Sequence, residues 1–137
     1  TFKNNKMNRD RLVELYKKYE LSKDDVYKHQ HYVIITRAGI EKIQSKEKIS
    51  ISYDVVECKT NFAVVRAKAF LIINPEHPIE TFGSALKGTN FKDGNCNSWY
   101  VMEMAEKRAL SRAVLKLTGF YELGVFGEDE SDDFKKK

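Results

Sequence analysis

Three basic residues recur at every fourth position late in the chain: Arg108, Arg112 and Lys116. This spacing places side chains above one another on one face of an α-helix. Arg112 has a basic residue four positions away on both sides, and each like-charged pair costs roughly a few tenths of a kcal/mol. An anionic ligand such as a phosphate would relieve this repulsion. A solvated helix face, whose cations suit the helix C-terminus, is the alternative interpretation.

The segment Phe62–Ile73 alternates between two kinds of side chain, as a strand with two different faces does. One face is small and apolar: Ala63, Val65, Ala67, Ala69 and Leu71. The other mixes rings and cations: Phe62, Arg66, Lys68 and Phe70. Cations that neutralise phosphates and rings that stack on bases are the groups that hold single-stranded nucleic acid. The alternative is a half-exposed sheet face on which Arg and Lys stems cover apolar surface.

A polar, glycine-containing loop at residues 87–98 precedes the last helix. Loops of about a dozen residues in a small domain are usually functional or mobile. This one places Lys87, Phe91 and Lys92 near Trp99, which adds cations and rings of the same kind. We count Lys87, Phe91 and Lys92 as candidate nucleic-acid contacts, while Trp99 has the alternative role of a core anchor at the helix start.

Signatures of catalysis are missing from the sequence. It contains no phosphate-binding loop, no serine-hydrolase elbow and no dinucleotide fingerprint. His29 and His31 form a candidate metal pair, but no Cys or carboxylate lies at metal-ligand spacing from them. Ordinary surface histidines are the simpler interpretation. We therefore expect no catalytic residue, no metal, no cofactor and no enzyme.

The chain ends in an acidic segment that contains one aromatic residue and is followed by three lysines. The segment comprises Glu128, Asp129, Glu130, Asp132, Asp133 and Phe134. It resembles the partner-recruiting tails of bacterial single-stranded DNA-binding proteins, which end in acids and a phenylalanine. A solubilising tail and a DNA mimic that folds back on the basic helix are two alternatives. We expect residues 1–127 to form one domain and residues 128–137 to be a disordered tail.

Composition limits the class of protein. A chain of 137 residues fits one domain with its own core. Its 24 Lys and Arg outnumber its 20 Asp and Glu, a net charge of +4 that agrees with nucleic-acid binding without requiring it. No apolar run approaches the roughly 18 residues of a membrane span. Cys58 and Cys96 form no CxxC pair, so we expect free thiols in a reducing cytoplasm.

Local patterns predict an α+β domain in which a three-stranded antiparallel meander, plus a short N-terminal strand, packs on a long C-terminal helix. Strands are predicted at Tyr32–Thr36, Ile49–Val55, Phe62–Ile73 and Ile79–Leu86. Helices are predicted from Asn8 to about Glu20, from Thr36 to about Ser45 and from Trp99 to Thr118, with a short helical turn from Ser22. Asn8, Thr36 and Ser98 are the expected N-caps, and Gly119 is expected to end the last helix.

With this order of elements, the chain resembles the single-strand annealing proteins of phage and eukaryotic recombination: the Erf, RecT and Redβ group and the eukaryotic ring-forming annealing mediator. The segments that carry the resemblance are Tyr32–Gln44, Phe82–Ala85 and Glu103–Gly119. The resemblance implies assembly into rings or filaments, with single-stranded DNA in a groove and its phosphates on cations. By position, Arg108, Arg112 and Lys116 match basic residues of the family's long helix, and Arg66 and Lys68 match basic strand residues. We expect these cations to cluster where the helix meets the neighbouring sheet, unmatched by acids of the same chain.

These patterns favour single-stranded DNA binding over a role as a protein-interaction module. We expect a cytoplasmic homo-oligomer, without membrane contact, that binds single-stranded DNA and anneals strands in phage or mobile-element recombination. A recombination or replication protein is the expected partner of the acidic tail. The alternative is a non-enzymatic interaction module, a phage-type adaptor or inhibitor, that acts through that tail.

Overall fold

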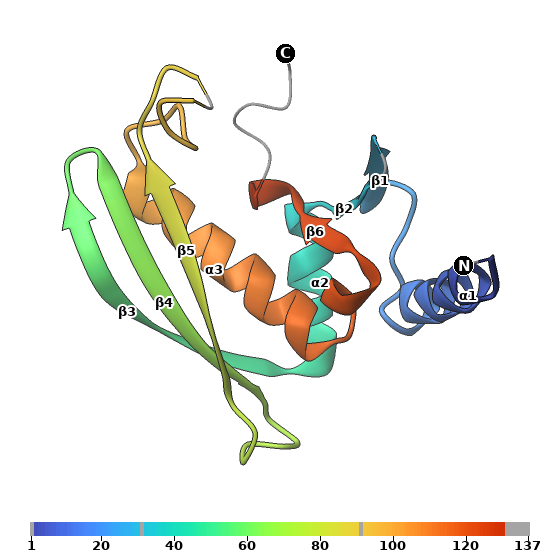
Figure 1. The fold of residues 1–137 in the computed structure, drawn as a ribbon. Helices are drawn as coiled ribbons and strands as arrows, with labels where there is room; N and C mark the ends of the chain where they lie inside the picture. Colours follow the sequence, from blue (N-terminus) through green and yellow to red (C-terminus); the bar gives the residue numbers. More distant parts are fainter. Residues whose placement is uncertain (1, 31, 91, 131–137) are drawn as a thin grey trace.

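The computed structural model describes residues 2–30, 32–90 and 92–130, and within these ranges the side chains of residues 7–129. Two small sheets lie on either side of a long central helix, α3 (Val101–Leu117), as Figure 1 shows. The predicted α+β architecture is confirmed, because an antiparallel three-stranded sheet packs on the C-terminal helix. The second sheet is larger than the single short strand that we predicted.

The sheet on α3 consists of β3 (Ile49–Lys59), β4 (Phe62–Leu71) and β5 (Ile79–Leu86), each antiparallel to the next. Only strand ends differ from the prediction: β3 continues through a bulge at Val55–Glu57, and β4 ends two residues earlier. The inner face is made of short, buried side chains: Ala63, Val65, Ala67, Ala69, Thr81 and Ala85. Because the facing residues of α3 are also alanines, at positions 105, 109 and 113, helix and sheet approach closely.

The second sheet has the strand order β1 (Val26–His29), β2 (Tyr32–Ile35), β6 (Val125–Gly127). β1 is antiparallel to β2, whereas β6 is parallel to it. We predicted only β2. The helical turn expected from Ser22 is wrong: Ser22 donates its amide to Asp25 at 2.9 Å and closes a turn that leads into β1.

The helices follow the predicted order with corrected ends. Helix α1 (Phe2–Lys18) begins well before Asn8, so Asn8 is not its N-cap, and no Pro or Gly interrupts the preceding residues. Helix α2 (Arg37–Glu47) is capped as predicted, because the Thr36 side chain accepts from the Gly39 amide at 3.2 Å. The prediction that Ser98 caps α3 is wrong: the N-cap is Tyr100, two residues later, and the Ser98 hydroxyl accepts from its amide at 3.0 Å.

A second core lies between α2, α3 and the small sheet. Its fully buried large side chains include Tyr19, Ile35, Ile40, Ile43, Leu115, Phe120 and Val125. Gly119 ends α3 with a φ of +88°, as predicted, and turns the chain into the 3-10 helix η1 (Tyr121–Leu123). The C-terminal half of α3 is thereby held between the two sheets, where the candidate site lies.

Asp25, in the turn before β1, is joined to α2 by an ion pair with Lys42. It is 4% exposed and accepts hydrogen bonds from the Ser22 amide and from Lys42 Nζ, the latter at 2.6 Å. Burial alone would raise the pKa of Asp25, but Lys42 and Ser22 outweigh burial and hold this pKa below its ordinary value. A depressed folded-state pKa stabilises the fold above the unfolded-state pKa of about 3.9, and this contribution is lost as pH falls through the folded-state pKa.

We expect Asp25→Asn to lower the free energy of unfolding at neutral pH by about 1–2 kcal/mol, a modest loss because solvent screens the 43% exposed side chain of Lys42. Urea unfolding over a pH series measures this. The difference between wild type and variant should shrink as pH falls below about 4. A difference that stays constant over the series would contradict the role given to the charge.

Candidate nucleic-acid interface

The predicted cations do not form one surface. α3 packs on the odd-numbered side chains of β4, which are buried, so the even-numbered Arg66 and Lys68 lie on the opposite face of the sheet. Figure 1 shows α3 against one face of this sheet, so Arg66 and Lys68 lie on the face turned away from α3. Our expectation that strand and helix cations converge is wrong.

The outer face of the sheet is also balanced in charge. Arg66 Nη2 lies 3.0 Å from Asp54 Oδ2, and this hydrogen-bonded ion pair raises the pKa of Arg66. Lys68 stands directly opposite Glu80 in the register of β4 and β5. Lys59 pairs with an acid on the same strand. Acids of the chain itself thus match these cations, contrary to the prediction.

Arg108 belongs to the interior rather than to an exposed stripe. Its side chain is 4% exposed. It donates hydrogen bonds to three backbone carbonyls: Ser84 at 2.8 Å, Asn95 at 2.6 Å and Asp129 at 3.0 Å. These bonds join α3 to β5, to the following loop and to the 3-10 helix η2 (Glu128–Glu130). Arg108 therefore has a structural role in the fold.

Arg112 and Lys116 are the members of the predicted stripe that reach the surface. Arg112 is half-buried, and its Nη1 donates to the Phe82 carbonyl at 2.8 Å. Lys116 is exposed, with Nζ 5.2 Å from the centre of the Tyr121 ring. Arg108 and Arg112 donate to the carbonyls of alternate residues of the edge strand β5. The two spacings match, because four residues of helix rise about 6 Å and alternate residues of a strand lie nearly as far apart.

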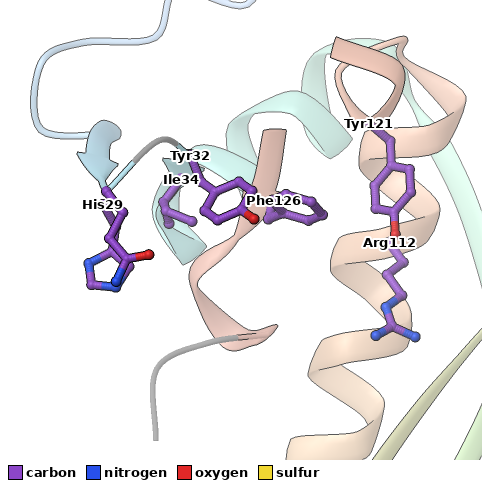
Figure 2. A pocket seen from close by; sticks show the side chains of 7 residues that line it. His29, Tyr32, Ile34, Arg112, Tyr121 and Phe126 are labelled. Atoms are coloured by element: carbon purple, nitrogen blue, oxygen red, sulfur yellow. The ribbon is translucent and has the colours of Figure 1, made fainter. Parts of the chain in front are cut away.

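A cleft of about 340 Å³ opens beside Arg112. We call it the aromatic cleft; it is lined by His29, Gln30, Tyr32, Ile34, Arg112, Tyr121 and Phe126. Figure 2 shows the three rings in a row, with His29 at one end and the Arg112 guanidinium at the other. The Phe126 ring meets Tyr32 at 5.4 Å and Tyr121 at 5.7 Å between centroids, both edge-to-face. Tyr32 remains 49% exposed.

The register of the small sheet builds this cleft. His29 pairs with Tyr32, and Ile34 pairs with Phe126, so these side chains share one face of the sheet. Alternate residues such as Ile35 and Val125 turn to the other face and are buried. The cleft was not predicted from the sequence because neither β1 nor β6 was predicted. The in-and-out alternation of residues 125–127 is visible only in their burial, because the sequence Val-Phe-Gly carries no alternation of polar and apolar residues.

The loop candidates lie at the other end of α3, at its N-terminus. Lys87 Nζ is 5.0 Å from the centre of the Trp99 ring, which is 64% exposed and therefore no core anchor. Lys92 is exposed and, with Phe62, lines a separate shallow hollow of about 350 Å³. Phe91 lies outside the described residues. These groups are distinct from the aromatic cleft.

The acidic segment begins inside the fold. Glu128 Oε1 accepts from the Arg37 amide at 2.7 Å, where a carboxylate suits the positive end of α2. Asp129 accepts from Arg108 through its backbone and from Ser111 Oγ at 3.4 Å through its side chain. Glu130 ends η2, and its side chain lies outside the described part. Asp132, Asp133 and Phe134 also lie outside it.

Neither a metal-binding cluster nor a membrane-spanning helix occurs in the described part of the chain. Within the described ranges, no three His, Cys, Asp or Glu side chains gather as a metal site would require. The helices of this part of the chain are too short or too polar to cross a bilayer. Cys58 is exposed and Cys96 is buried, and neither forms a disulfide; Cys96 Sγ lies 3.3 Å from the Ser98 carbonyl oxygen.

The aromatic cleft therefore suits a ligand that is both flat and anionic, because it offers rings and a guanidinium. Comparisons of the chain with protein-family models, with curated proteins and with solved structures gave no match.

Proposed function

We propose that the chain binds single-stranded DNA non-covalently at the aromatic cleft, with Arg112 and Lys116 as the neighbouring cations. One observation carries the proposal: three neighbouring rings, of which Tyr32 is exposed, stand next to two cations, one turn apart, on α3. Stacking on such rings contributes about 1–3 kcal/mol per base, and cations neutralise the adjoining phosphates. No bond is made or broken in this function.

Single strands fit the cleft better than duplexes do. In a duplex the faces of each base are covered by its neighbours, so rings of a protein reach them only after costly unstacking. The rings that line the cleft come from β2, β6 and η1, and the Tyr32 side chain is half exposed. Only a base that is already free of its stack can contact them without that cost.

The resemblance to annealing proteins extends the proposal beyond binding. It includes self-assembly along a strand, annealing of complementary strands, and action in the cytoplasm during phage or mobile-element recombination. The segment Glu103–Gly119, which carries much of the resemblance, forms α3 and supplies both cations of the proposed site.

Fluorescence anisotropy with a labelled oligodeoxythymidine at several salt concentrations tests the proposal. We expect Arg112→Gln combined with Lys116→Gln to make the slope of log K against log salt less negative by about 1.4, since each lost phosphate contact on a single strand contributes about 0.7. The matched control, Lys17→Gln with Lys23→Gln, removes two exposed cations outside the cleft and should leave the slope unchanged.

Circular dichroism of each variant must show an intact fold, because Arg112 also bonds to β5. Equal slopes for the cleft pair and the control pair would reject the site. If wild-type protein at micromolar concentration and low salt binds no oligonucleotide, the function itself is rejected, and the interaction module is favoured.

A further inference from the structure

The dimensions and lining of the aromatic cleft indicate which unit of a strand it takes. We propose that the cleft holds one unstacked nucleotide, with its base among the rings of Tyr32, Phe126 and Tyr121 and its phosphate at Arg112. This inference rests on the proposed function for its role, and it adds the chemical class of the ligand at that site. It makes the cleft a nucleotide pocket, which free nucleotides should also enter.

The size of the cleft sets the first limit. At about 340 Å³ it lies near the lower end of the small-molecule pockets of proteins, which span roughly 300–1,000 Å³. A single nucleotide suits such a volume, whereas several consecutive nucleotides do not. The rest of a bound strand must then run outside the cleft, past α3 and its cations.

The geometry of the rings sets a second limit on the ligand. Phe126 meets Tyr32 at an interplanar angle of 76° and Tyr121 at 81°. In an edge-to-face pair, the edge of one ring covers a face of the other ring only, whereas stacked rings cover one face of each. Ring faces therefore remain for a flat ligand, and Tyr32 is 49% exposed. A nucleobase has the flat π-face that such a site requires.

The polar groups at the rim of the cleft set a third limit on the ligand. Arg112 carries five N–H donors in a planar fork that matches the oxygens of a phosphate, and the bond from its Nη1 to the Phe82 carbonyl at 2.8 Å fixes the fork at the rim. At the far end, His29 and Gln30 supply donors and acceptors of the kind that read the edge of a base (Figure 2 shows His29 there). Rings in the middle, a guanidinium at one end and amide or imidazole groups at the other end match the order base edge, base face, phosphate.

Nuclear magnetic resonance of the full chain tests the inference directly. Thymidine 5′-monophosphate, thymidine and inorganic phosphate are each titrated against labelled protein. We expect the nucleotide to shift the amide signals of Tyr32, Tyr121 and Phe126, with an affinity that exceeds those of thymidine and of phosphate. Tyr32→Ala should weaken nucleotide binding at least about fivefold, as the loss of one stacking partner does.

The control is Tyr100→Ala, which removes a tyrosine that is 71% exposed at the start of α3, outside the cleft. It should leave nucleotide affinity unchanged. Because Phe126 is partly buried, Phe126→Ala carries a risk of unfolding, and Tyr32→Ala is the deciding variant. Both tyrosine variants are checked for a native spectrum before titration.

The results separate this inference from the proposed function. Nucleotide shifts that map to the cleft, together with no binding of oligodeoxythymidine, uphold the pocket and reject single-strand binding. Oligonucleotide binding that is unaffected by Tyr32→Ala, together with nucleotide shifts elsewhere or none, overturns the pocket and leaves strand binding to the cations of α3.

Discussion

Arg108→Met is expected to lower the free energy of unfolding by about 3–5 kcal/mol and the melting temperature by roughly 10 °C or more. The guanidinium of Arg108 is buried and donates to carbonyls on β5, on the loop after it and on η2. Methionine preserves much of the volume but removes the Arg108 donors from all three carbonyls, of which Ser84 keeps a bond from Asn95 Nδ2 at 3.3 Å. Each buried group that is left unsatisfied costs about 1–3 kcal/mol. Thermal and urea unfolding followed by circular dichroism measure the loss.

Two companion variants sharpen this test. Lys107→Met removes the same charge from the neighbouring residue, for which the structure gives no such bonds, and should change stability by less than about 0.5 kcal/mol. Arg108→Lys keeps the charge but replaces the fork of donors with one ammonium, so it should recover only part of the loss. Equal melting temperatures for Arg108→Met and Lys107→Met would refute the structural role of Arg108.

The stripe at Arg108, Arg112 and Lys116 shows what helical spacing can and cannot reveal. The prediction that the three share one helix and one general direction is confirmed. Their burial was not predictable, because the carbonyls around Arg108 come from segments 24 and 13 residues earlier and 21 residues later in the chain. A cation that bonds to backbone carbonyls has the same sequence pattern as a cation that awaits a phosphate.

Elements with local signals were predicted well. β5 was predicted from Ile79 to Leu86 and has those bounds, and Thr36 caps α2 as its hydroxyl and position indicated. The signals in both cases lie within a few residues: alternation, flanking turn residues and a capping side chain. By contrast, β6 has three residues and exists through parallel pairing with β2, about ninety residues earlier. Nothing local specifies such a strand.

The candidate site was predictable only in part. Alternation along β4 already places Arg66 and Lys68 opposite the alanine face that α3 covers, so the expected convergence with α3 conflicted with our own strand pattern. The aromatic cleft was beyond reach for a different reason. Its rings and its guanidinium come from β2, β6, η1 and α3, and only the register of the second sheet brings them together.

Gly83→Ala is expected to be the most damaging conservative change in the strands, with a loss of at least about 3 kcal/mol in the free energy of unfolding. A Cβ at Gly83 would lie 2.1 Å from the Ala105 carbonyl oxygen and 2.5 Å from the Ala109 amide nitrogen. Both atoms belong to the backbone of α3, which cannot move aside as a flexible side chain does. Helix and strand must separate, and Thr81 would then lose its 2.7 Å bond to the Ala109 carbonyl.

The sign of this effect distinguishes packing from backbone strain. Gly83 does not adopt a left-handed φ, so alanine there would by itself stabilise the protein by about 0.4–1 kcal/mol through the unfolded state. Gly124 is the matched control: its φ is +81° and no atom lies within 4 Å of the added Cβ, so Gly124→Ala should cost only about 1 kcal/mol of backbone strain. Separation of β5 from α3 also moves the Phe82 carbonyl away from Arg112, so Gly83→Ala should weaken single-strand binding as well. If Gly83→Ala unfolds no more easily than Gly124→Ala, then β5 and α3 are not in close contact. Both the fold and the position of Arg112 depend on that contact.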